Sequence, residues 1–266
     1  MTERYAVIGN PVAHSQSPTI HARFAQATGQ DIAYDRIDAP LDGFERAVEE
    51  FRASGGRGLN VTLPFKQAAF RYCEKVSDRA SAAQAVNTIV CADRVFGDNT
   101  DGIGLVRDLE GNLGLQLRGK SVLLMGAGGA ARGVAGSLAD AKVARLVIAN
   151  RTFSKAAELA ARFAPAVAMP YEKLEGAFDI VINATSASLS GAELVLPASV
   201  IGKSGVAYDM AYGRDTAFLQ AARRAGARCS DGLGMLVEQA AESFFIWHGV
   251  RPATRAVLAS LRGNPD

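Results

Sequence analysis

The stretch Ser121-Val-Leu-Leu-Met-Gly-Ala-Gly-Gly-Ala-Ala-Arg-Gly133 contains the clearest structural signal of the chain. Its apolar run, Val122 to Met125, has the length of a buried strand, and a glycine turn follows. Gly126, Gly128 and Ala131 fit the pattern G-x-G-x-x-G/A, in which the glycines allow a tight turn and the close approach of a pyrophosphate. Small residues compatible with a helix come next. A strand, glycine turn and helix in this order indicate a dinucleotide site whose phosphates lie on the helix N-terminus.

The next predicted strand, Arg145 to Asn150, indicates which dinucleotide is bound. In NAD sites this strand usually ends with Asp or Glu, which binds the ribose 2′-hydroxyl. Here the strand ends with Asn150-Arg151-Thr152, and Lys155 follows. A guanidinium holds a 2′-phosphate with two hydrogen bonds, whereas a carboxylate repels it. The sequence therefore favours NADP(H) over NAD(H), with a solvated arginine at a helix start as the alternative interpretation.

The composition is typical of a globular protein with room for two domains. The chain has 266 residues, of which 48% are hydrophobic and 21% charged, and its net charge is +2. This balance excludes a strongly basic surface for nucleic acid, and no apolar run has the length of a membrane span. The chain starts directly with a predicted strand rather than a signal peptide. The three cysteines, Cys73, Cys91 and Cys229, show no metal-ligand spacing. We expect a reduced, cytoplasmic α/β protein without a metal site.

The first hundred residues form a separate predicted α/β unit with polar side chains at its strand ends. A short strand over 5–9 runs into a loop in which Ser17, followed by Pro18, has the pattern of a helix N-cap. Ser15 and Ser17 also place two hydroxyls beside a helix N-terminus, which suits a small carboxylate, so capping and carboxylate binding both stay open. Lys66 follows a strand that ends at Pro64. Open α/β sheets bind their ligands at such strand ends.

From residue 117 onward, strands alternate with helices, which indicates a parallel, doubly wound sheet. After the glycine turn the sequence predicts strands over 145–150, 178–185 and 205–212, with a helix over 153–163. A linking helix is predicted over 102–111, and two helices are predicted near the C-terminus, over 232–247 and 253–261. In the first unit, a strand starting at Ala85 turns back as a hairpin through Gly97.

Motifs spread over nearly the whole chain carry a family resemblance. The first half contains Ser15-x-Ser17-Pro18, Asn60-Val-Thr62-x-Pro64-Phe65-Lys66, Ala85-Val-Asn87-Thr88 and Gly97-Asp-Asn99-Thr-Asp101-Gly102. The second half contains Gly126-Ala-Gly-Gly-Ala130, Asn150-Arg-Thr152, Asn183-Ala-Thr-Ser186 and Asp231-Gly-Leu-Gly-Met-Leu-Val-Glu-Gln239. In this order the motifs resemble those of the shikimate dehydrogenase family. The motifs of the first half are far more specific than the glycine turn.

The resemblance implies two α/β domains with the active site in a cleft between them. The substrate domain would span 1–101, the helices of 235–266 would pack back on it, and a Rossmann-like, doubly wound NADP domain would span 102–234. The implied activity is the reversible, NADPH-dependent reduction of 3-dehydroshikimate to shikimate, with Lys66 and Asp101 as the catalytic pair. The partners would be this small molecule and NADP, with no nucleic acid or membrane, and the protein would be a monomer or homodimer.

The resemblance also assigns binding residues. Those implied for the substrate are Ser15, Ser17, Thr62, Lys66, Asn87, Asp101, Tyr212 and Gln239. Those implied for the cofactor are Asp78, Gly126, Ala127, Gly128, Gly129, Ala130, Asn150, Arg151, Thr152, Lys155, Met210 and Gly232. Three positions depart from the family's pattern. Gln84 and Ser188 stand where the family often has glycine, and no proline follows Tyr212, which puts local loop geometry in question but removes no matched functional residue.

Three other interpretations stay open at this point. A quinate/shikimate dehydrogenase with broader substrate or NAD use is the nearest alternative. An NADP-responsive regulatory protein belongs to a different class, and loss of Lys66 or Asp101 would favour it, yet both are present. A methylenetetrahydrofolate-type dehydrogenase shares the two-domain outline but has no need of the Ser15-x-Ser17 pair.

Overall fold

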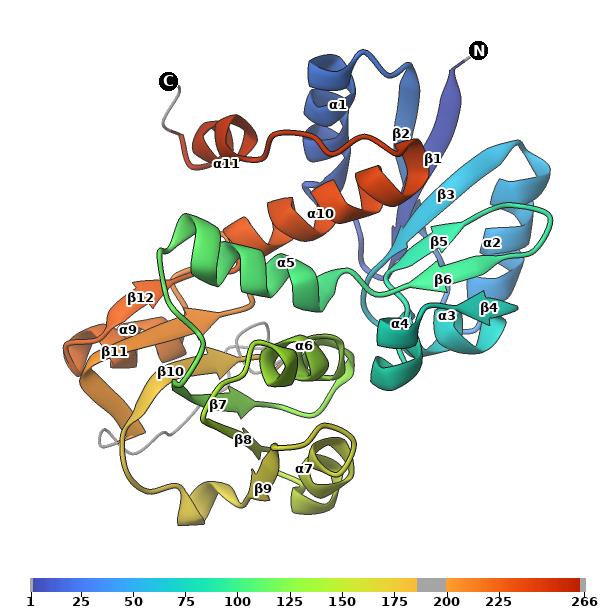
Figure 1. The fold of residues 1–266 in the computed structure, drawn as a ribbon. Helices are drawn as coiled ribbons and strands as arrows, with labels where there is room; N and C mark the ends of the chain where they lie inside the picture. Colours follow the sequence, from blue (N-terminus) through green and yellow to red (C-terminus); the bar gives the residue numbers. More distant parts are fainter. Residues whose placement is uncertain (1, 186–199, 264–266) are drawn as a thin grey trace. The chain divides into compact units, whose positions relative to one another are not determined.

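The computed structural model describes residues 2–185 and 200–263, leaving out the side chains of 202–204. In it the chain forms two compact units (Figure 1). Unit 1 consists of Met1–Gly104 together with Leu236–Asp266, and unit 2 of Leu105–Met235. The assignment of unit 1 to the substrate and unit 2 to the cofactor stays a prediction.

Unit 1 contains a mixed sheet with the strand order β2-β1-β3-β5-β6-β4. Its strands are β1 (Glu3–Gly9), β2 (Ile32–Asp38), β3 (Gly56–Val61), β4 (Lys75–Val76), β5 (Thr88–Val90) and β6 (Phe96–Asp98). The strand β1 is parallel to both of its neighbours, whereas β5 is antiparallel to β3 and to β6. The predicted hairpin is therefore confirmed. The two-residue strand β4, which pairs in parallel with β6, has no signal in the sequence.

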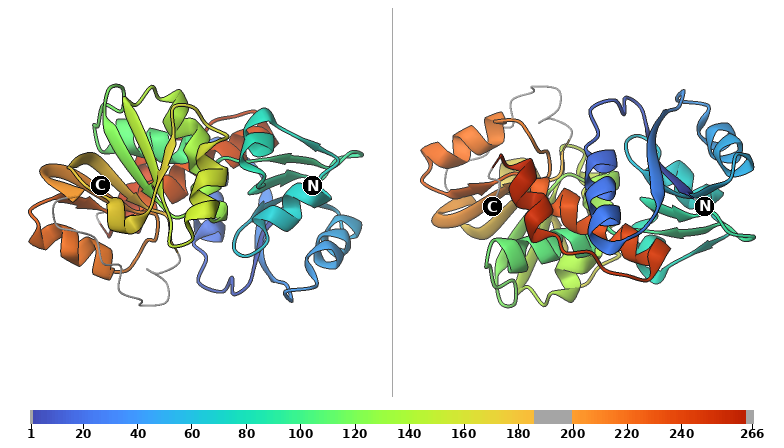
Figure 2. Two further views of the ribbon diagram at one scale, coloured as in Figure 1. Left: turned by 90° about the horizontal axis from the view of Figure 1, so that it is seen from below. Right: turned by 90° about the horizontal axis from the view of Figure 1, so that it is seen from above.

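Helices pack around this sheet. The helices of unit 1 are α1 (Ser17–Thr28), α2 (Phe44–Ala53), α3 (Lys66–Tyr72), α4 (Asp78–Ala83) and α11 (Arg255–Leu261). Of these, α2, α3 and α4 contribute apolar side chains to the core of the sheet. Phe44, Val48 and Phe51 of α2 recur at helical spacing and are buried in one core with Leu59 of β3. The helix α11 contacts α1, and the right panel of Figure 2 brings both into view.

Two further helices, α5 (Asp101–Arg107) and α10 (Leu233–His248), each begin in one unit and end in the other. The end of α10 is fixed on the sheet of unit 1 by Trp247, whose indole N–H donates to the carbonyl of Ile89 at 3.0 Å. Gly58 of β3 makes room for this ring, because a Cβ there would lie 2.5 Å from the indole nitrogen. The C-terminal part of the chain thus packs on the sheet formed by its first hundred residues.

Unit 2 contains a sheet of six strands, all parallel, in the order β12-β11-β10-β7-β8-β9. The predicted parallel, doubly wound sheet is confirmed, although the sequence did not indicate the three-residue strands β9 and β12. The strands are β7 (Ser121–Met125), β8 (Arg145–Ala149), β9 (Val167–Met169), β10 (Phe178–Asn183), β11 (Ile201–Asp209) and β12 (Arg228–Ser230). The helices are α6 (Gly129–Asp140), α7 (Phe153–Ala160) and α9 (Ala217–Arg224), with a π-helical turn η1 (Asp108–Asn112) and a 3₁₀ turn η2 (Tyr171–Lys173).

The central strands β7 and β8 of unit 2 are apolar after their first residue, as is typical of parallel strands that are buried on both faces. Val122 to Met125 and Leu146 to Ala149 are fully buried. In Figure 1, α6 lies beside β7, α7 beside β8 and β9, and α9 beside β11 and β12. Phe218 and Leu219 of α9 pack in one core with Phe178 of β10.

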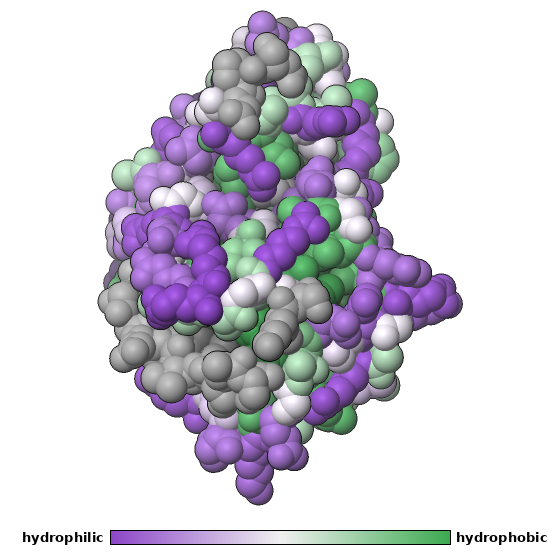
Figure 3. All heavy atoms as spheres, turned by 90° about the vertical axis from the view of Figure 1, so that its left-hand side faces the viewer, coloured by the Kyte–Doolittle hydropathy of each residue, from purple (hydrophilic) through white to green (hydrophobic). Residues whose placement is uncertain are grey.

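The outer surface mixes polar and apolar side chains. Figure 3 shows hydrophilic residues over much of one face, with smaller hydrophobic areas between them. Among the described residues, the large hydrophobic side chains that are exposed are Leu41, Leu63, Phe153, Val167 and Phe245. Within 2–185 and 200–263, no helix combines the length and the apolar composition that crossing a membrane requires.

Candidate active site

Lys66 and Asp101 form a shielded ion pair in unit 1. The Lys66 ammonium contacts the Asp101 Oδ2 atom, and the two side chains are 14% and 5% exposed. Each residue is the first of a helix, α3 and α5 respectively. A carboxylate is favoured at a helix N-terminus and an ammonium is disfavoured there, so the Asp101 charge offsets the unfavourable position of Lys66. The structure brings the predicted catalytic pair into direct contact although 35 positions separate its members.

The Asn87 side chain holds the other oxygen of this carboxylate. Its Nδ2 atom donates to Asp101 Oδ1 at 2.8 Å and to Gln239 Oε1 at 3.2 Å. Gln239 in turn donates to the carbonyl of Leu236 at 2.9 Å. Three residues predicted to bind substrate are therefore connected to Lys66: Asp101 directly, Asn87 through Asp101, and Gln239 through Asn87.

The strand pattern explains why these side chains meet. Lys66 follows the end of β3 and Asp101 follows the end of β6, which runs in the same direction because β5 is antiparallel to both. Asn87 precedes β5, so it lies at that same edge, and its backbone N–H donates to the carbonyl of Asp98 at 3.0 Å. This is the edge formed by the carboxyl ends of the parallel strands, where open α/β sheets bind ligands.

Ser15 and Ser17 lie in the loop after β1 and at the start of α1, and both are buried. The Ser15 hydroxyl lies 3.2 Å from the Ser17 hydroxyl and accepts from the Ser17 backbone N–H at 3.3 Å. The predicted N-cap role of Ser17 is wrong. Gln16 occupies the cap position, no side chain caps α1, and the helix begins at Ser17 itself with Pro18 in its first turn. Neither hydroxyl caps this helix. This agrees with a role of the two hydroxyls in binding a carboxylate.

Thr62 directly follows β3 and is half-buried. Its backbone N–H donates to the carbonyl of Ile8 at 2.9 Å, which fixes it beside the end of β1. Gly9 allows this approach, since a Cβ there would lie 2.5 Å from the Thr62 methyl group. Thr62 therefore belongs to the same sheet edge as Lys66.

The glycine turn of unit 2 has the geometry of a phosphate cradle. Gly126 has φ +109°, and a Cβ there would lie 2.9 Å from the carbonyl of Ala184, so only glycine fits. A Cβ at Gly128 would meet nothing within 4 Å, which leaves open space beside the backbone. The helix α6 starts at Gly129 with no side-chain cap and no acidic residue in its first turn. Within the described residues no acceptor faces the N–H groups of the segment from Ala127 to Ala130, so this turn fits the pyrophosphate of a dinucleotide.

The segment after β8 fits a second anion. Asn150, Arg151, Thr152 and Lys155 lie between the end of β8 and the first turn of α7, and the Asn150 side chain donates to the Thr152 carbonyl at 3.0 Å. Arg151 and Lys155 are exposed, and neither forms an ion pair within the described part of the chain. Two cations at a helix N-terminus oppose the helix dipole. A bound phosphate group at this position would remove that conflict.

Three predicted contacts lie on the loops that follow β11 and β12. The Met210 N–H donates to the Asn183 carbonyl at 2.9 Å, and Tyr212 follows two residues later. A Cβ at Gly232 would lie 2.3 Å from the Met210 carbonyl oxygen, so glycine is required where these two loops touch. Asp209 fixes the first loop by accepting from the Thr216 hydroxyl at 2.7 Å. These three residues therefore lie together in unit 2, and their contacts with ligands stay predictions.

Asp78 has a simpler structural explanation. It is the first residue of α4 and is exposed, directly after Ser77, whose hydroxyl accepts from the Ala80 N–H at 3.2 Å. A carboxylate in this position is favoured by the helix dipole. Among the departures from the family's pattern, Gln84 ends this helix in a left-handed conformation with φ 51°, which is where glycine is favoured. Ser188, like Ser186 of the Asn183 motif, lies outside the described residues.

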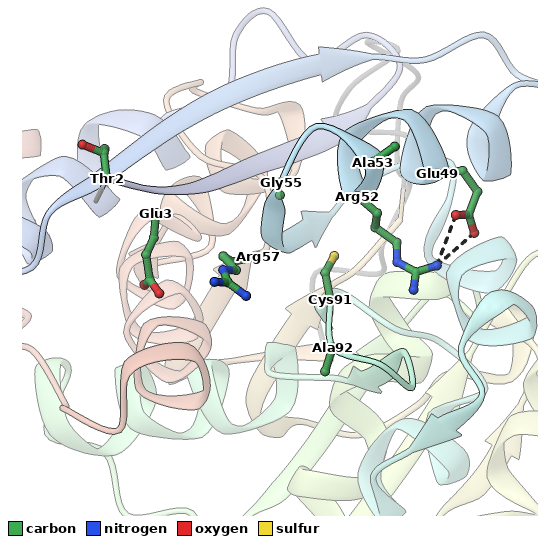
Figure 4. Close-up of a pocket in the computed structure, with 10 residues that line it drawn as sticks. Thr2, Glu3, Glu49, Arg52, Ala53, Gly55, Arg57, Cys91 and Ala92 are labelled. Carbon is green, nitrogen blue, oxygen red and sulfur yellow. Dashed lines mark hydrogen bonds and ion pairs between the residues drawn. The ribbon is translucent and has the colours of Figure 1, made fainter.

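A separate pocket of about 780 Å³ lies at the other edge of the unit 1 sheet (Figure 4). It is formed at the starts of β1 and β3, where the Arg52 guanidinium faces the Glu49 carboxylate. Its lining residues are Thr2, Glu3, Glu49, Arg52, Ala53, Gly55, Gly56, Arg57, Cys91 and Ala92. This lining contains none of the predicted site residues, and the amino ends of parallel strands are not where α/β sheets bind substrates.

Taken together, the two units define a dinucleotide-binding α/β dehydrogenase. One unit carries a shielded lysine–carboxylate pair beside hydroxyl and amide groups, and the other carries a glycine turn followed by an uncapped helix.

Comparison with known proteins identifies the family. Residues 7–89 match the model of the shikimate dehydrogenase substrate binding domain, residues 109–214 that of shikimate / quinate 5-dehydrogenase, and residues 232–262 that of the shikimate 5′-dehydrogenase C-terminal domain. The chain is 56% identical to the shikimate dehydrogenase (NADP(+)) of Dechloromonas aromatica, over 99% of each chain. The chain belongs to the shikimate dehydrogenase family.

Two solved structures have the same fold over nearly the whole chain. An Ael1 enzyme from Pseudomonas putida is 50% identical, with a TM-score of 0.93 and 98% of each chain covered. Shikimate 5-dehydrogenase from Thermus thermophilus, solved in complex with NADP(H) and shikimate, is 35% identical. Its TM-score is 0.89, with 99% of this chain and 100% of that chain covered.

The structure adds two residues that sequence reasoning missed. Thr100 and Ser243 are fully buried among the predicted substrate residues, and their hydroxyls lie 3.3 Å apart. Thr100 also lies 2.9 Å from Asn87 Nδ2. Thr100 sits inside a quoted motif, which was the only available signal, whereas Ser243 follows the last motif on the same helix.

Proposed function

We propose that this protein catalyses the reversible, NADPH-dependent reduction of the ring ketone of 3-dehydroshikimate to shikimate. The observation that carries the proposal is the Lys66–Asp101 pair, shielded at the carboxyl edge of the unit 1 sheet and tied to Asn87. The curated relative from Dechloromonas aromatica has this activity by name, and the Thermus enzyme binds both NADP(H) and shikimate.

Lys66 and Asp101 would perform the proton transfer. When bound, NADPH supplies the hydride that adds to the ring carbonyl carbon. The carbonyl oxygen then carries the electron pair of the former double bond, and the Lys66 ammonium donates a proton to it, leaving a neutral amine and a hydroxyl. In the oxidative direction the amine takes that proton back. Asp101 holds Lys66 in place through Oδ2 and is itself held by Asn87 through Oδ1.

The remaining polar groups of unit 1 suit a hydroxylated ring acid. Ser15 and Ser17 would bind the carboxylate, and Thr62, Asn87, Asp101 and Gln239 the ring hydroxyls. Tyr212 of unit 2 would make one further substrate contact. A substrate that lacks one of these hydroxyls would leave a buried polar group unpaired, at a cost of about 1–3 kcal/mol.

NADP would be held by unit 2. Gly126, Ala127, Gly128, Gly129 and Ala130 would bind the pyrophosphate, and Asn150, Arg151, Thr152 and Lys155 the 2′-phosphate. Met210 and Gly232 would contact the nicotinamide half. We also retain Asp78 as a proposed cofactor contact, although its position at the start of α4 already explains a carboxylate there.

The decisive experiment compares initial rates with shikimate and quinate, each offered NADP or NAD. Turnover confined to shikimate with NADP is the expected result. Comparable quinate or NAD turnover would move the protein to the broader quinate/shikimate class. Binding of NADP without turnover in any of the four mixtures would instead support a regulatory protein.

The cysteines bear on where the enzyme works. The thiols of Cys73, Cys91 and Cys229 are all free, as a reducing compartment requires, and we propose that the enzyme works in the cytoplasm. We further propose a monomer or homodimer, which sedimentation equilibrium would distinguish.

A further inference from the structure

A line of polar side chains, buried except for the half-buried Tyr34, ends at the Asp101 carboxylate in unit 1. Beyond Asn87 it consists of Thr88, Ser243, Asn60 and Tyr34, none of which the predicted site includes. Thr88 and Ser243 are fully buried, and Asn60 is 5% exposed. Buried polar groups that are all hydrogen-bonded rigidify a site, whereas one unpaired member is costly. The direction of each hydrogen bond in this line therefore matters for the carboxylate at its end.

The direction of the Asn87 amide is fixed by its neighbours. Its Nδ2 atom faces the Asp101 Oδ1 atom at 2.8 Å, and a carboxylate oxygen only accepts. On the other side, Asn87 Oδ1 accepts from the Thr100 backbone N–H at 2.8 Å, and a backbone N–H only donates. Both contacts require the same orientation. A flipped Asn87 would place two oxygens together at Asp101 and two N–H groups together at Thr100.

Beyond Asn87, each hydroxyl can donate only one hydrogen bond. Its choice of acceptor therefore fixes the direction of the next hydrogen bond in the line. Thr88 lies 2.9 Å from Asn87 Oδ1 and donates to it. Its oxygen then accepts from the Ser243 hydroxyl at 2.7 Å, since the single Thr88 proton is already used. The Ser243 proton has a second acceptor, the Gln239 carbonyl, but that contact is longer, at 3.1 Å. Ser243 in turn accepts from Asn60 Nδ2 at 2.9 Å. The Asn60 Oδ1 atom accepts from the Tyr34 hydroxyl at 2.7 Å.

The result is a one-way chain of donors that runs from Tyr34 to the catalytic carboxylate. Desolvation raises the pKa of Tyr34 well above its ordinary value of 10.0. The phenol at the far end of the chain therefore stays protonated, and its O–H donates a hydrogen bond to Asn60. Hydrogen bonds aligned in one direction polarise one another and strengthen the last bond, here that of Asn87 to Asp101.

We propose that Thr88 and Ser243 are positioning residues for the reaction: Asp101 and Thr100 set the orientation of the Asn87 amide, and Thr88, itself held by Ser243, keeps this amide in place and thereby holds Asp101 against Lys66. The inference rests on the function proposed above. It also gives α10 a task in catalysis, because Ser243 is the one residue of this helix whose hydroxyl bridges Thr88 and Asn60 among the described residues.

Removal of one hydroxyl breaks the chain at a known point. Without the Ser243 hydroxyl, Asn60 Nδ2 loses its shortest acceptor and keeps the Asn87 carbonyl at 3.3 Å. Thr88 keeps only the long 3.5 Å contact from Asn60 Nδ2 as a donor. The Thr88 hydroxyl is then held less firmly, which weakens one of the three donors that reach the Asn87 oxygen. The Lys66–Asp101 pair remains present but less firmly oriented, so the chemical step slows while cofactor binding is unaffected.

The test is a double-mutant cycle with Thr88→Val and Ser243→Ala, in which the first change removes the hydroxyl and keeps the shape. Rates of shikimate oxidation by NADP and the KM for NADP are measured for each variant. We expect each single variant to lose at least about tenfold in kcat with an unchanged KM for NADP, and the double variant to lose no more than the worse single one. Thr88→Ser, which keeps the hydroxyl, should recover most of the wild-type kcat.

One control and the conservative variant Thr88→Ser make the outcomes distinct. Thr28→Val removes a hydroxyl that donates only within α1, to the carbonyls of Phe24 and Ala25, and should keep wild-type kinetics. Independent, multiplying losses in the cycle, or a Thr88→Val variant with wild-type kcat, would overturn the inference. If Thr88→Val does not fold, the kcat values of Thr88→Ser and Ser243→Ala test the inference without it. A low kcat for Thr88→Ser would show that the methyl group matters and not the hydroxyl. Absence of shikimate turnover in the wild type would refute the proposed function itself.

Discussion

Gly104→Ala tests whether the close contact between α5 and α10 positions the candidate site. Gly104 lies on α5, and a Cβ there would lie 2.7 Å from the Cβ of Gln239 and 2.8 Å from its backbone nitrogen. Both distances are far below normal contact, and one of the atoms is backbone, which cannot rotate away. The two helices must therefore move apart at the residue proposed to bind a ring hydroxyl.

The expected loss of stability follows from the overlap between the added Cβ and Gln239. Extra carbon in a well-packed interior destabilises by about 1–3 kcal/mol. For a protein of this size that corresponds to a fall in Tm of about 2–12 °C, at about 2–4 °C for each kcal/mol. Because Gln239 also accepts a hydrogen bond from Asn87, the shift should raise the KM for shikimate severalfold and leave the KM for NADP unchanged.

The assay combines thermal unfolding with steady-state rates on Gly104→Ala and Gly111→Ala. Gly111 is the matched control, since it is exposed and a Cβ there would meet nothing within 4 Å. The control should unfold within about 2 °C of the wild type, at most slightly stabilised by the lower entropy of its unfolded chain. A Gly104→Ala protein with the wild-type Tm and the wild-type KM for shikimate would refute the reasoning.

Three further predictions concern single side chains. Arg151→Ala should raise the KM for NADPH about tenfold, by loss of a charge-assisted hydrogen bond, and barely change the use of NADH; equal losses with both would show that Arg151 does not bind the 2′-phosphate. Gln84→Gly should raise the free energy of unfolding by up to about 1 kcal/mol, because the left-handed φ of 51° strains a side chain, and a loss of stability in urea denaturation would contradict this. Burial lowers the pKa of His21 to about 3, so below pH 6.5 the unfolded chain binds a proton that the folded protein does not, and stability falls as the pH falls. His21→Phe should flatten this fall between pH 6.5 and 3 by up to about 1.4 kcal/mol per pH unit, and an unchanged slope would argue against a neutral buried His21.

The sequence predicted best what local pattern encodes. The buried run before Gly126 and the alternation of strands and helices predicted the parallel sheet of unit 2, because its central strands β7 and β8 are apolar after their first residue. Strands of two or three residues, such as β4 and β12, are too short to show any period. Ser17 shows a different failure. Its pattern predicts an N-cap, yet the helix begins one residue earlier than a cap requires, and its hydroxyl contacts Ser15 instead.

The candidate site could be predicted only where motifs marked it. The Lys66–Asp101 contact joins residues 35 positions apart, and neither residue by itself differs from an ordinary surface charge in the sequence. The hydrogen bond from Asn60 to Ser243 spans 183 positions. The hydrophobic periodicity of α10 does not predict which of its faces packs on which strand. The hydrogen bonds that link Ser243 to Asn60 and Thr88 therefore could not be predicted from the sequence. Gln84 departs from the family's pattern in the sequence, but its left-handed backbone is visible only in the fold.

The central claim is that Lys66 transfers the proton, and the most direct measurement is kcat for Lys66→Ala with shikimate and NADP. Lys75→Ala, at an exposed lysine on β4, serves as the control and should keep the wild-type rate. We predict a fall in kcat of at least about 100-fold, the lower range for loss of a general acid–base group, with little change in KM. A Lys66→Ala enzyme that keeps near-full kcat would remove Lys66 from the chemistry and contradict the proposed mechanism.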